Sequence, residues 1–200
     1  MNMTKASKMI VLTAVALSVS LPVRAADGYS CSLRVGNSTA AQTISEGNGK
    51  RKSGRVKQSS KTVSRVVTWP VSGSVRGEPA PSAKDVKLMC YFIGTTDGKA
   101  TMLGTETKNV ALDEKGNFKL DVSAPADKLV HTTTVTKSRG RRRGGRSGST
   151  KSTTSGTRVT GCIIQLLVKD KVERAYASNS GWGVYAKKHP LSEEDILKIR

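Results

Sequence analysis

Short runs in which apolar and polar residues alternate recur along this chain, and they constrain its fold more than any motif does. Tyr29, Cys31, Leu33 and Val35 alternate with polar residues, the period-two pattern of a half-buried strand. The run from Lys84 to Thr95 is apolar on both faces, which predicts a fully buried strand. About seven to nine such runs, separated by turn residues, predict an all-β protein, an antiparallel β-sandwich.

Turn residues between these runs predict how the strands connect. Asp97-Gly98 is a strong hairpin signal, because glycine accepts the positive φ that a tight turn needs. The runs Leu129–Thr136 and Arg158–Lys169 flank an arginine-rich stretch and predict a hairpin with an expanded turn. Trp69-Pro70 lies in a β-branched run. Since proline cannot donate to a ladder, we expect an edge strand here, or two strands that meet at a bend.

Only the C-terminal tail has a helical pattern. Ser192 is a suitable N-cap, and Glu193, Glu194 and Asp195 would lie at the positive end of the helix dipole. A helix of about nine residues is marginal alone. We therefore expect this short C-terminal helix to dock on the body of the protein.

The N-terminus has the pattern of a secretory signal peptide. Lys5 and Lys8 precede an uncharged apolar run from Met9 to Leu21, and Ala25-Ala26 offers a cleavage site. The apolar run is shorter than the ~20 residues that span a bilayer. We expect a signal peptide at 1–25, a single domain at 26–200 with no transmembrane span, and a secreted or periplasmic location.

The positive charge of the chain is concentrated in two segments. The whole sequence has 34 basic and 15 acidic residues, and removal of residues 1–25 leaves 31 basic residues, for a net charge of +16. The segment from Lys50 to Arg65 contains seven basic residues and no acidic one, and the segment from Lys137 to Arg158 contains eight and none. The remainder has 16 basic and 15 acidic residues, so the body is nearly neutral.

Both segments are rich in Gly, Ser and Thr, which predicts mobile basic loops at about 45–61 and 137–157. Arg139–Gly148 resembles the Arg-Gly arms of RNA-binding proteins. It lacks interleaved aromatic residues, and the signal peptide argues against cytoplasmic nucleic acid as a partner. An anionic envelope or matrix polymer is the expected partner. The candidate polyanion-binding residues are Lys50, Arg51, Lys52, Arg55, Lys57, Arg139, Arg141, Arg142, Arg143 and Arg146.

Three cysteines remain after removal of the signal peptide, and all three lie on apolar strand faces: Cys31, Cys90 and Cys162. A secreted location permits disulfides. A Cys90–Cys162 bond is the favoured pairing, because these cysteines lie on the two most apolar strands and could meet across the core. The alternative is that all three are reduced core residues.

The strand pattern over residues 62–180 resembles the immunoglobulin-like and fibronectin type III-like sandwiches of secreted bacterial proteins of unknown function. The chain departs from a true immunoglobulin domain. Trp69 lies too far from Cys31, and no tyrosine stands two residues before Cys162. Tyr29 has the tyrosine-corner spacing to Cys31, but at the other end of the chain. No functional residue carries over from this resemblance.

Residues that could carry catalysis are few. His131 lies in a threonine-rich strand and His189 precedes Pro190, and neither has a sequence context that suggests a triad. The acids Asp113, Glu114, Asp121 and Asp127 are interpreted as solvated turn residues, with paired carboxylates as the alternative. Patterns for zinc or calcium ligands are missing from the sequence, so we expect neither a metal nor a cofactor.

Three hypotheses of function follow. The first is a non-enzymatic secreted binding module whose basic loops contact an anionic surface or polymer. The second is a structural or protein–protein interaction sandwich on which the basic loops are disordered decoration. The third is a small hydrolase or protease inhibitor with its site at the loop ends.

Overall fold

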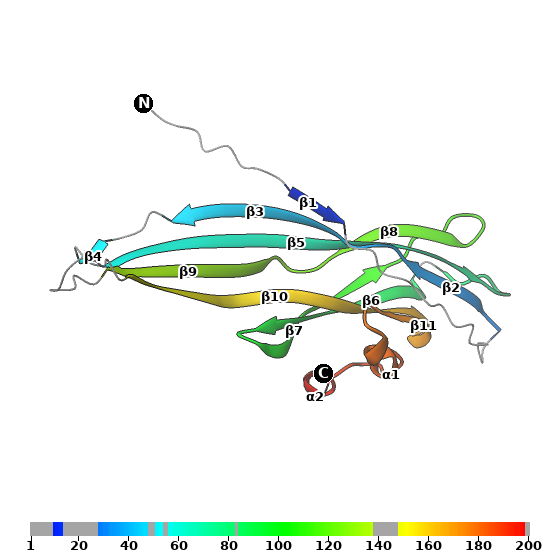
Figure 1. The fold of residues 1–200 in the computed structure, drawn as a ribbon. Coiled ribbons are helices and arrows are strands. Elements are labelled where there is room, and N and C mark those ends of the chain that lie inside the picture. Colours follow the sequence, from blue (N-terminus) through cyan, green and yellow to red (C-terminus); the bar gives the residue numbers. More distant parts are fainter. Residues whose placement is uncertain are drawn as a thin grey trace, which may run out of the picture.

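The computed structural model describes residues 10–13, 28–47, 51–53, 56–82, 84–137 and 148–198. These residues form an antiparallel β-sandwich, as predicted, with short helical turns near the C-terminus (Figure 1). The strands are β1 (Ile10–Thr13), β2 (Ser30–Val35), β3 (Thr39–Gly47), β4 (Arg51–Ser53), β5 (Val56–Arg76), β6 (Val86–Thr96), β7 (Lys99–Asn109), β8 (Asn117–Ser123), β9 (Asp127–Lys137), β10 (Gly148–Val168) and β11 (Lys171–Ala177).

Two strands of 21 residues, β5 and β10, organise the sandwich. The C-terminal half of β5 pairs with β2 on one side and β8 on the other. The C-terminal half of β10 lies between β6 and β11, and β7 pairs with the far side of β6. These two groups of strands are the two layers of the body.

The core lies between the two layers. Alternate residues of β2, β5 and β8 face alternate residues of β6 and β10, and the rings of Trp69 and Phe92 stack with centroids 6.1 Å apart. The predicted alternation in the first strand is confirmed, because Cys31, Leu33 and Val35 are buried and the residues between them are exposed.

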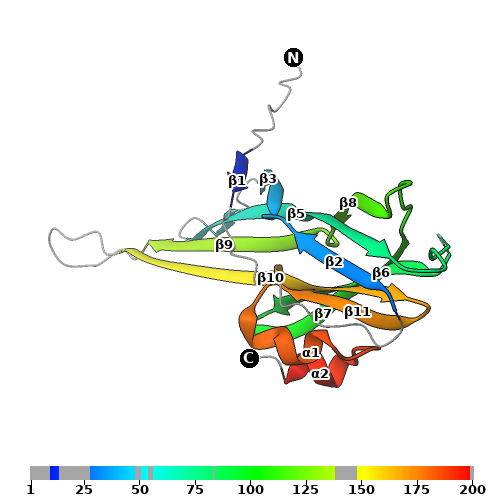
Figure 2. The same ribbon diagram turned by 90° about the vertical axis from the view of Figure 1, so that its right-hand side faces the viewer.

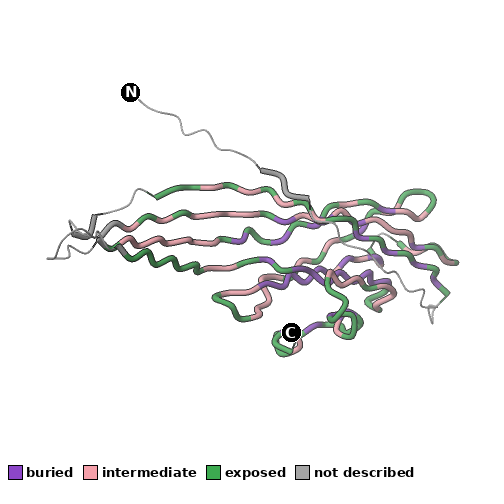
Figure 3. The backbone as a smooth tube through the Cα atoms, viewed as in Figure 1, coloured by how far each residue is buried: buried purple, intermediate pink, exposed green. Residues whose placement is uncertain are grey.

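A four-stranded sheet extends beyond the body, and we call it the arm. It consists of β3 together with residues 56–65 of β5, β9 and residues 148–157 of β10. Figure 1 shows these strands running together away from the core, and Figure 3 shows that the buried segments concentrate in the body. Of the arm side chains that the structure describes, Asp127 at the base is the buried one.

The arm corrects the prediction of mobile loops at 45–61 and 137–157. Residues 56–61 belong to β5, residues 148–157 belong to β10, and the short β4 pairs with β5. Threonine and valine favour strands, and each of these stretches finds an antiparallel partner. The sequence prediction failed because these strands bury neither face. Residues 48–50, 54–55 and 138–147 lie outside the described residues.

The C-terminal segment covers the face of the β6–β10 layer that points away from the core (Figure 2). It comprises a 3-10 turn (Ser180–Trp182) and the short helices α1 (Gly183–Ala186) and α2 (Glu193–Leu197). Ser192 caps α2 through a capping box with Asp195, which confirms the predicted helix start. Trp182, Ala186, Leu191 and Ile196 pack on this face and form a second hydrophobic cluster. Within the described ranges, no helix is long and apolar enough to cross a membrane.

Four residues of the expected signal peptide are placed in the structure. Ile10–Thr13 pairs antiparallel with Thr39–Gln42 at the outer edge of β3. The remainder of 1–25 lies outside the described residues, so the signal peptide and the secreted location stay predictions.

Candidate functional site

Three of the ten basic residues predicted to bind a polyanion lie at the end of the arm farthest from the body. Arg51 and Lys52 lie in β4, and Lys57 lies near the start of β5. The others lie outside the described residues, in the two stretches that connect the arm strands: Lys50, Arg55, Arg139, Arg141, Arg142, Arg143 and Arg146.

Strand register brings the two basic segments to one end of the arm. Val56 pairs with Thr136 between β5 and β9, and Lys137 pairs with Gly148 between β9 and β10. The start of β5, the end of β9 and the start of β10 therefore lie next to one another at this end of the arm. Val56 and Arg65 are nine residue steps apart along β5, so at ~3.3 Å per step this end lies roughly 30 Å from the base of the arm. The sequence alone could not show this, because the pairing is non-local.

Exposed lysines continue the positive charge along the arm. Lys61, Lys128 and Lys151 are exposed, and none of them forms an ion pair with another described residue. The arm strands contain only two acids, Glu46 and Asp127, and Asp127 is neutralised by an ion pair with Arg65. The net charge of the arm is therefore positive along its length.

Arg65 and Asp127 form a buried polar joint at the base of the arm. Arg65 Nε and Nη2 donate to Asp127 Oδ2 at 3.0 and 2.7 Å, and Nη2 also donates to the Val159 carbonyl at 3.0 Å. The Val159 amide donates to the same Oδ2 at 3.1 Å. Asp127 is 1% exposed, so its interpretation as a solvated turn acid is wrong. Asp127 thus supplies a hydrogen-bond acceptor for the Val159 amide of β10. At this point β10 separates from β9, and a bulge lies at Val159–Gly161.

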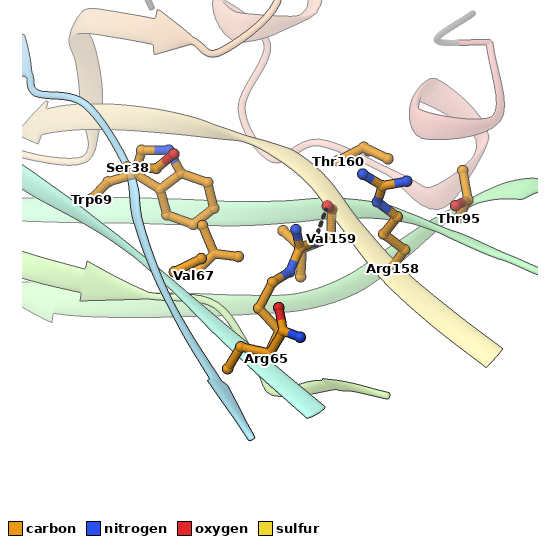
Figure 4. A pocket seen from close by; sticks show the side chains of 10 residues that line it. Ser38, Arg65, Val67, Trp69, Thr95, Arg158, Val159 and Thr160 are labelled. Carbon is orange, nitrogen blue, oxygen red and sulfur yellow. Dashed lines mark hydrogen bonds between the residues drawn. The ribbon is translucent and has the colours of Figure 1, made fainter. Parts of the chain in front are cut away.

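A cleft of about 600 Å³ opens beside this joint, between the two layers (Figure 4). One wall comes from β3 and β5, and the other comes from β10 and β6. Figure 4 shows Trp69 beside Ser38 on the first wall and Arg158 beside Thr95 and Thr160 on the second. The cleft is lined by Ser38, Ala40, Gln42, Arg65, Val67, Trp69, Thr95, Arg158, Val159 and Thr160. Sequence reasoning singled out none of these residues as a ligand site.

The two histidines lie in different parts of the molecule. His131 Nδ1 is 2.9 Å from Thr154 Oγ1 on the arm, whereas His189 Nδ1 is 3.1 Å from Gln165 Oε1 beneath the C-terminal segment. Neither histidine has a carboxylate partner among the described residues. The described structure therefore brings together no catalytic triad.

The acids singled out from the sequence do not form a cluster that could hold a metal. Asp113 organises its own turn, and hydrogen bonds from Asn117 and from the Lys115 amide lower the pKa of its carboxyl group. Asp121 is exposed on β8, and Asp127 forms an ion pair with Arg65. Across the described ranges, no group of three or more His, Cys, Asp or Glu side chains could hold a metal ion.

The cysteines are buried free thiols, and the predicted Cys90–Cys162 disulfide is not formed. Cys90 pairs with Ile164 and Cys162 with Phe92, so the two cysteines are diagonal neighbours on adjacent strands and do not face each other across the core. Diagonal neighbours are about 7–8 Å apart, beyond the usual disulfide separation. Burial raises the pKa of Cys31 to about 11 and that of Cys90 to about 12, and it raises the pKa of Cys162 further.

Comparison of the chain with protein-family models, with curated proteins and with solved structures gives no significant match in any of the three. The resemblance to immunoglobulin-like and fibronectin type III-like domains therefore stays a prediction.

Proposed function

We propose that this protein is a non-enzymatic secreted binding module whose arm holds two basic segments against an anionic envelope or matrix polymer. The observation that carries the proposal is the register of β5, β9 and β10, which brings the strand ends that flank the two basic segments to one end of the arm. One polymer chain can then contact both segments at once. Multiple phosphate or sulfate contacts through lysine and arginine give strong, salt-dependent binding without a specific pocket.

The charge distribution supports an extended ligand over a small one. Lys61, Lys128 and Lys151 extend the positive charge from the far end of the arm, its tip, toward the base of the arm. The arm is roughly 30 Å long at ~3.3 Å per residue. Outside the two basic segments, the mature chain has 16 basic residues, Lys128 among them, and 15 acidic residues, so the body adds little net attraction. A polyanion is therefore drawn to the arm and not to the body.

A location outside the cytoplasm belongs to the same proposal. Cleavage after Ala25 removes Ile10–Thr13, and this leaves the outer edge of β3 without its partner strand. Mass spectrometry of the exported protein should give an N-terminus at Ala26 or Asp27. An intact N-terminus on protein recovered from the cytoplasm would contradict this part of the proposal.

Binding to heparin, a sulfated polymer, tests the proposed function. A tip variant replaces Arg139, Arg141, Arg142 and Arg143 by Gln, and an arm variant replaces Lys61, Lys128 and Lys151 by Gln. The matched control replaces Lys84, Lys119 and Lys187, three exposed lysines outside the arm, by Gln. Both test variants should elute from a heparin column at lower salt than the wild type, with the larger change for the tip variant. Unchanged elution of the tip variant, or an equal change in the control, would refute polyanion binding by the arm.

A second function is favoured by the open edge of the arm. Residues 148–155 of β10 pair only with β9, since pairing with β6 begins at Thr157. An unpaired edge can accept a strand from another protein. Under this alternative the tip variant keeps its partner, whereas Thr153→Pro in β10 loses it.

A further inference from the structure

The cleft at the base of the arm is lined by arginines and hydroxyl groups but by no carboxylate. Binding of a polymer at the far end of the arm does not account for this lining. Its apolar surface comes from Ala40, Val67, Trp69 and Val159. Its polar groups are two guanidiniums, one amide and three hydroxyls, and no carboxylate lines it. A volume of about 600 Å³ is in the range of small-molecule sites.

Two arginine groups at the cleft keep free hydrogen-bonding capacity. Arg158 is exposed and has no hydrogen bond or ion pair with any described residue. Arg65 uses Nε and Nη2 for Asp127 and Val159, and its Nη1 has no partner among the described residues. The contacts with Asp127 and Val159 therefore hold the Arg65 guanidinium in place and leave its Nη1 available as a donor.

Trp69 adds a donor to the apolar wall. The residue is 4% exposed, yet its indole nitrogen makes no hydrogen bond to any described residue. Every buried side-chain nitrogen or oxygen of the described residues has a partner, so this indole nitrogen is not a buried atom. Figure 4 shows the indole nitrogen at the Ser38 side of the ring.

Asp127, the acid that contacts Arg65, already has its hydrogen-bond partners. Asp127 does not line the cleft, and its Oδ2 accepts from Arg65 Nε, Arg65 Nη2 and the Val159 amide. A ligand in the cleft therefore meets unpartnered donors and an uncompensated positive charge from Arg158. Guanidinium groups bind planar or tetrahedral oxyanions in bidentate geometry.

We propose that the cleft binds an amphipathic anion, a single apolar chain with a carboxylate, sulfate or phosphate head group. The head group lies between Arg158 and Arg65 Nη1, and the chain lies against Val67, Trp69 and Ala40. Charge complementarity selects the anion, and the apolar wall selects an amphiphile over a small inorganic ion.

Calorimetric titration of the full mature chain with decanoate, below its micelle concentration, tests this site. Decyl sulfate tests the head group, and decanol tests whether charge is required. Arg158→Gln should weaken decanoate binding about tenfold, because a charge-assisted contact is lost. The matched control is Arg34→Gln, an exposed arginine on β2 outside the cleft, and its affinity should equal that of the wild type. Ala40→Trp places a large side chain in the cleft beside its apolar wall and should abolish binding.

Two further variants separate this site from the basic tip. Trp69→Phe should remove the change in tryptophan emission on binding, whereas Trp182→Phe should keep it, because Trp182 packs in the second cluster. The tip variant should bind decanoate like the wild type. Equal affinity for decanol, unchanged binding by Arg158→Gln, or loss of binding in the tip variant would each overturn the proposal.

Discussion

Arg65 Nη2 lies 2.7 Å from Asp127 Oδ2, although the two residues are 62 positions apart in the chain. This pair lies where the four-stranded arm divides into the two layers of the body. Asp127 is the first residue of β9, and through the Val159 amide it also holds β10 where that strand leaves β9. The joint links β5, β9 and β10 at the base of the arm, and its Arg65 side chain lines the cleft.

Removal of this carboxylate should destabilise the protein more than removal of any exposed acid. Asp127→Ala leaves Arg65 and the Val159 amide without their acceptor, and loss of one partner of a buried pair should lower the free energy of unfolding by about 3 kcal/mol. Urea denaturation followed by circular dichroism measures the change.

An exposed acid and a double variant serve as controls for the joint. Asp121→Ala on β8 should change the free energy of unfolding by less than about 0.5 kcal/mol. Arg65→Met combined with Asp127→Leu should lose less than the sum of the two single variants, by about 1 kcal/mol or more. Additive losses would show that the pair does not act as a unit.

The thiols should be unreactive in the folded protein. Burial raises the pKa of Cys31 to about 11 and that of Cys90 to about 12, so all three cysteines stay protonated at pH 8. A maleimide should label no thiol in native protein and three in denaturant. Rapid native labelling, or a mass two daltons lower under non-reducing conditions, would contradict the buried free thiols.

Alkaline pH should destabilise the fold through the same thiols. Their pKa values in the folded protein lie above the value of 9.0 for a free thiol, so the unfolded chain releases protons that the folded chain retains. The stability from the neutral thiols is fully present below pH 9 and is lost as the pH rises toward 11 and 12. Replacing Cys90 and Cys162 by Ala should reduce this dependence in urea denaturation between pH 8 and 10.

The C-terminal segment should detach when Gln165 is replaced. The buried Gln165 side chain donates to the carbonyls of Ala186 and Lys188, which lie in and after α1. Gln165→Leu leaves both carbonyls without this donor, at a cost of about 2 kcal/mol. Trp182 should then become solvated, and its emission should shift to the red. Adding Trp182→Phe to Gln165→Leu should abolish the red shift, which would show that Trp182 is its source. An unchanged emission spectrum in Gln165→Leu would show that the Gln165 amide does not hold the C-terminal segment.

Backbone amides of the arm should exchange faster than those of the body. Residues 149–155 are exposed and lie on an edge strand, whereas residues 162–168 of the same strand are buried between β6 and β11. Local opening is governed by buried contacts, so the two ends of β10 should differ in protection. Hydrogen-exchange mass spectrometry resolves peptides from each end, and equal protection would mean that the arm is stabilised by contacts beyond those described.

Strands with a buried face were predictable from the sequence, and strands without one were not. The run from Lys84 to Thr95 corresponds to β6, and Asp97-Gly98 forms its turn with φ values of 50° and 84°. The arm strands are rich in Ser and Thr, and Asp127 is the only one of their described side chains that is buried, so no period of burial marks them. Their composition resembles that of loops, and only their pairing identifies them as strands.

The edge strand predicted from Trp69-Pro70 is wrong for a local reason. β5 has partners on both sides, but β3 pairs with it only up to Thr68, and β2 begins at Val71. Pro70 lies in the gap between these partners, where its carbonyl accepts from the Gly36 amide. The missing proline N–H therefore costs no ladder hydrogen bond. The site was hidden for a different reason, because only long-range strand register brings Arg65, Asp127 and Val159 together.

The salt dependence of heparin-oligosaccharide binding tests the central claim most directly, that two basic segments at one end of the arm act as one site. Four proteins are compared: the wild type, the tip variant, a variant with Lys50, Arg51, Lys52, Arg55 and Lys57 replaced by Gln, and the combination. We expect one oligosaccharide per protein, and a slope of log affinity against log salt that becomes shallower with each group of charges removed. Binding of two oligosaccharides per protein would contradict the claim. So would a slope that stays at the wild-type value when either segment alone has lost its charges.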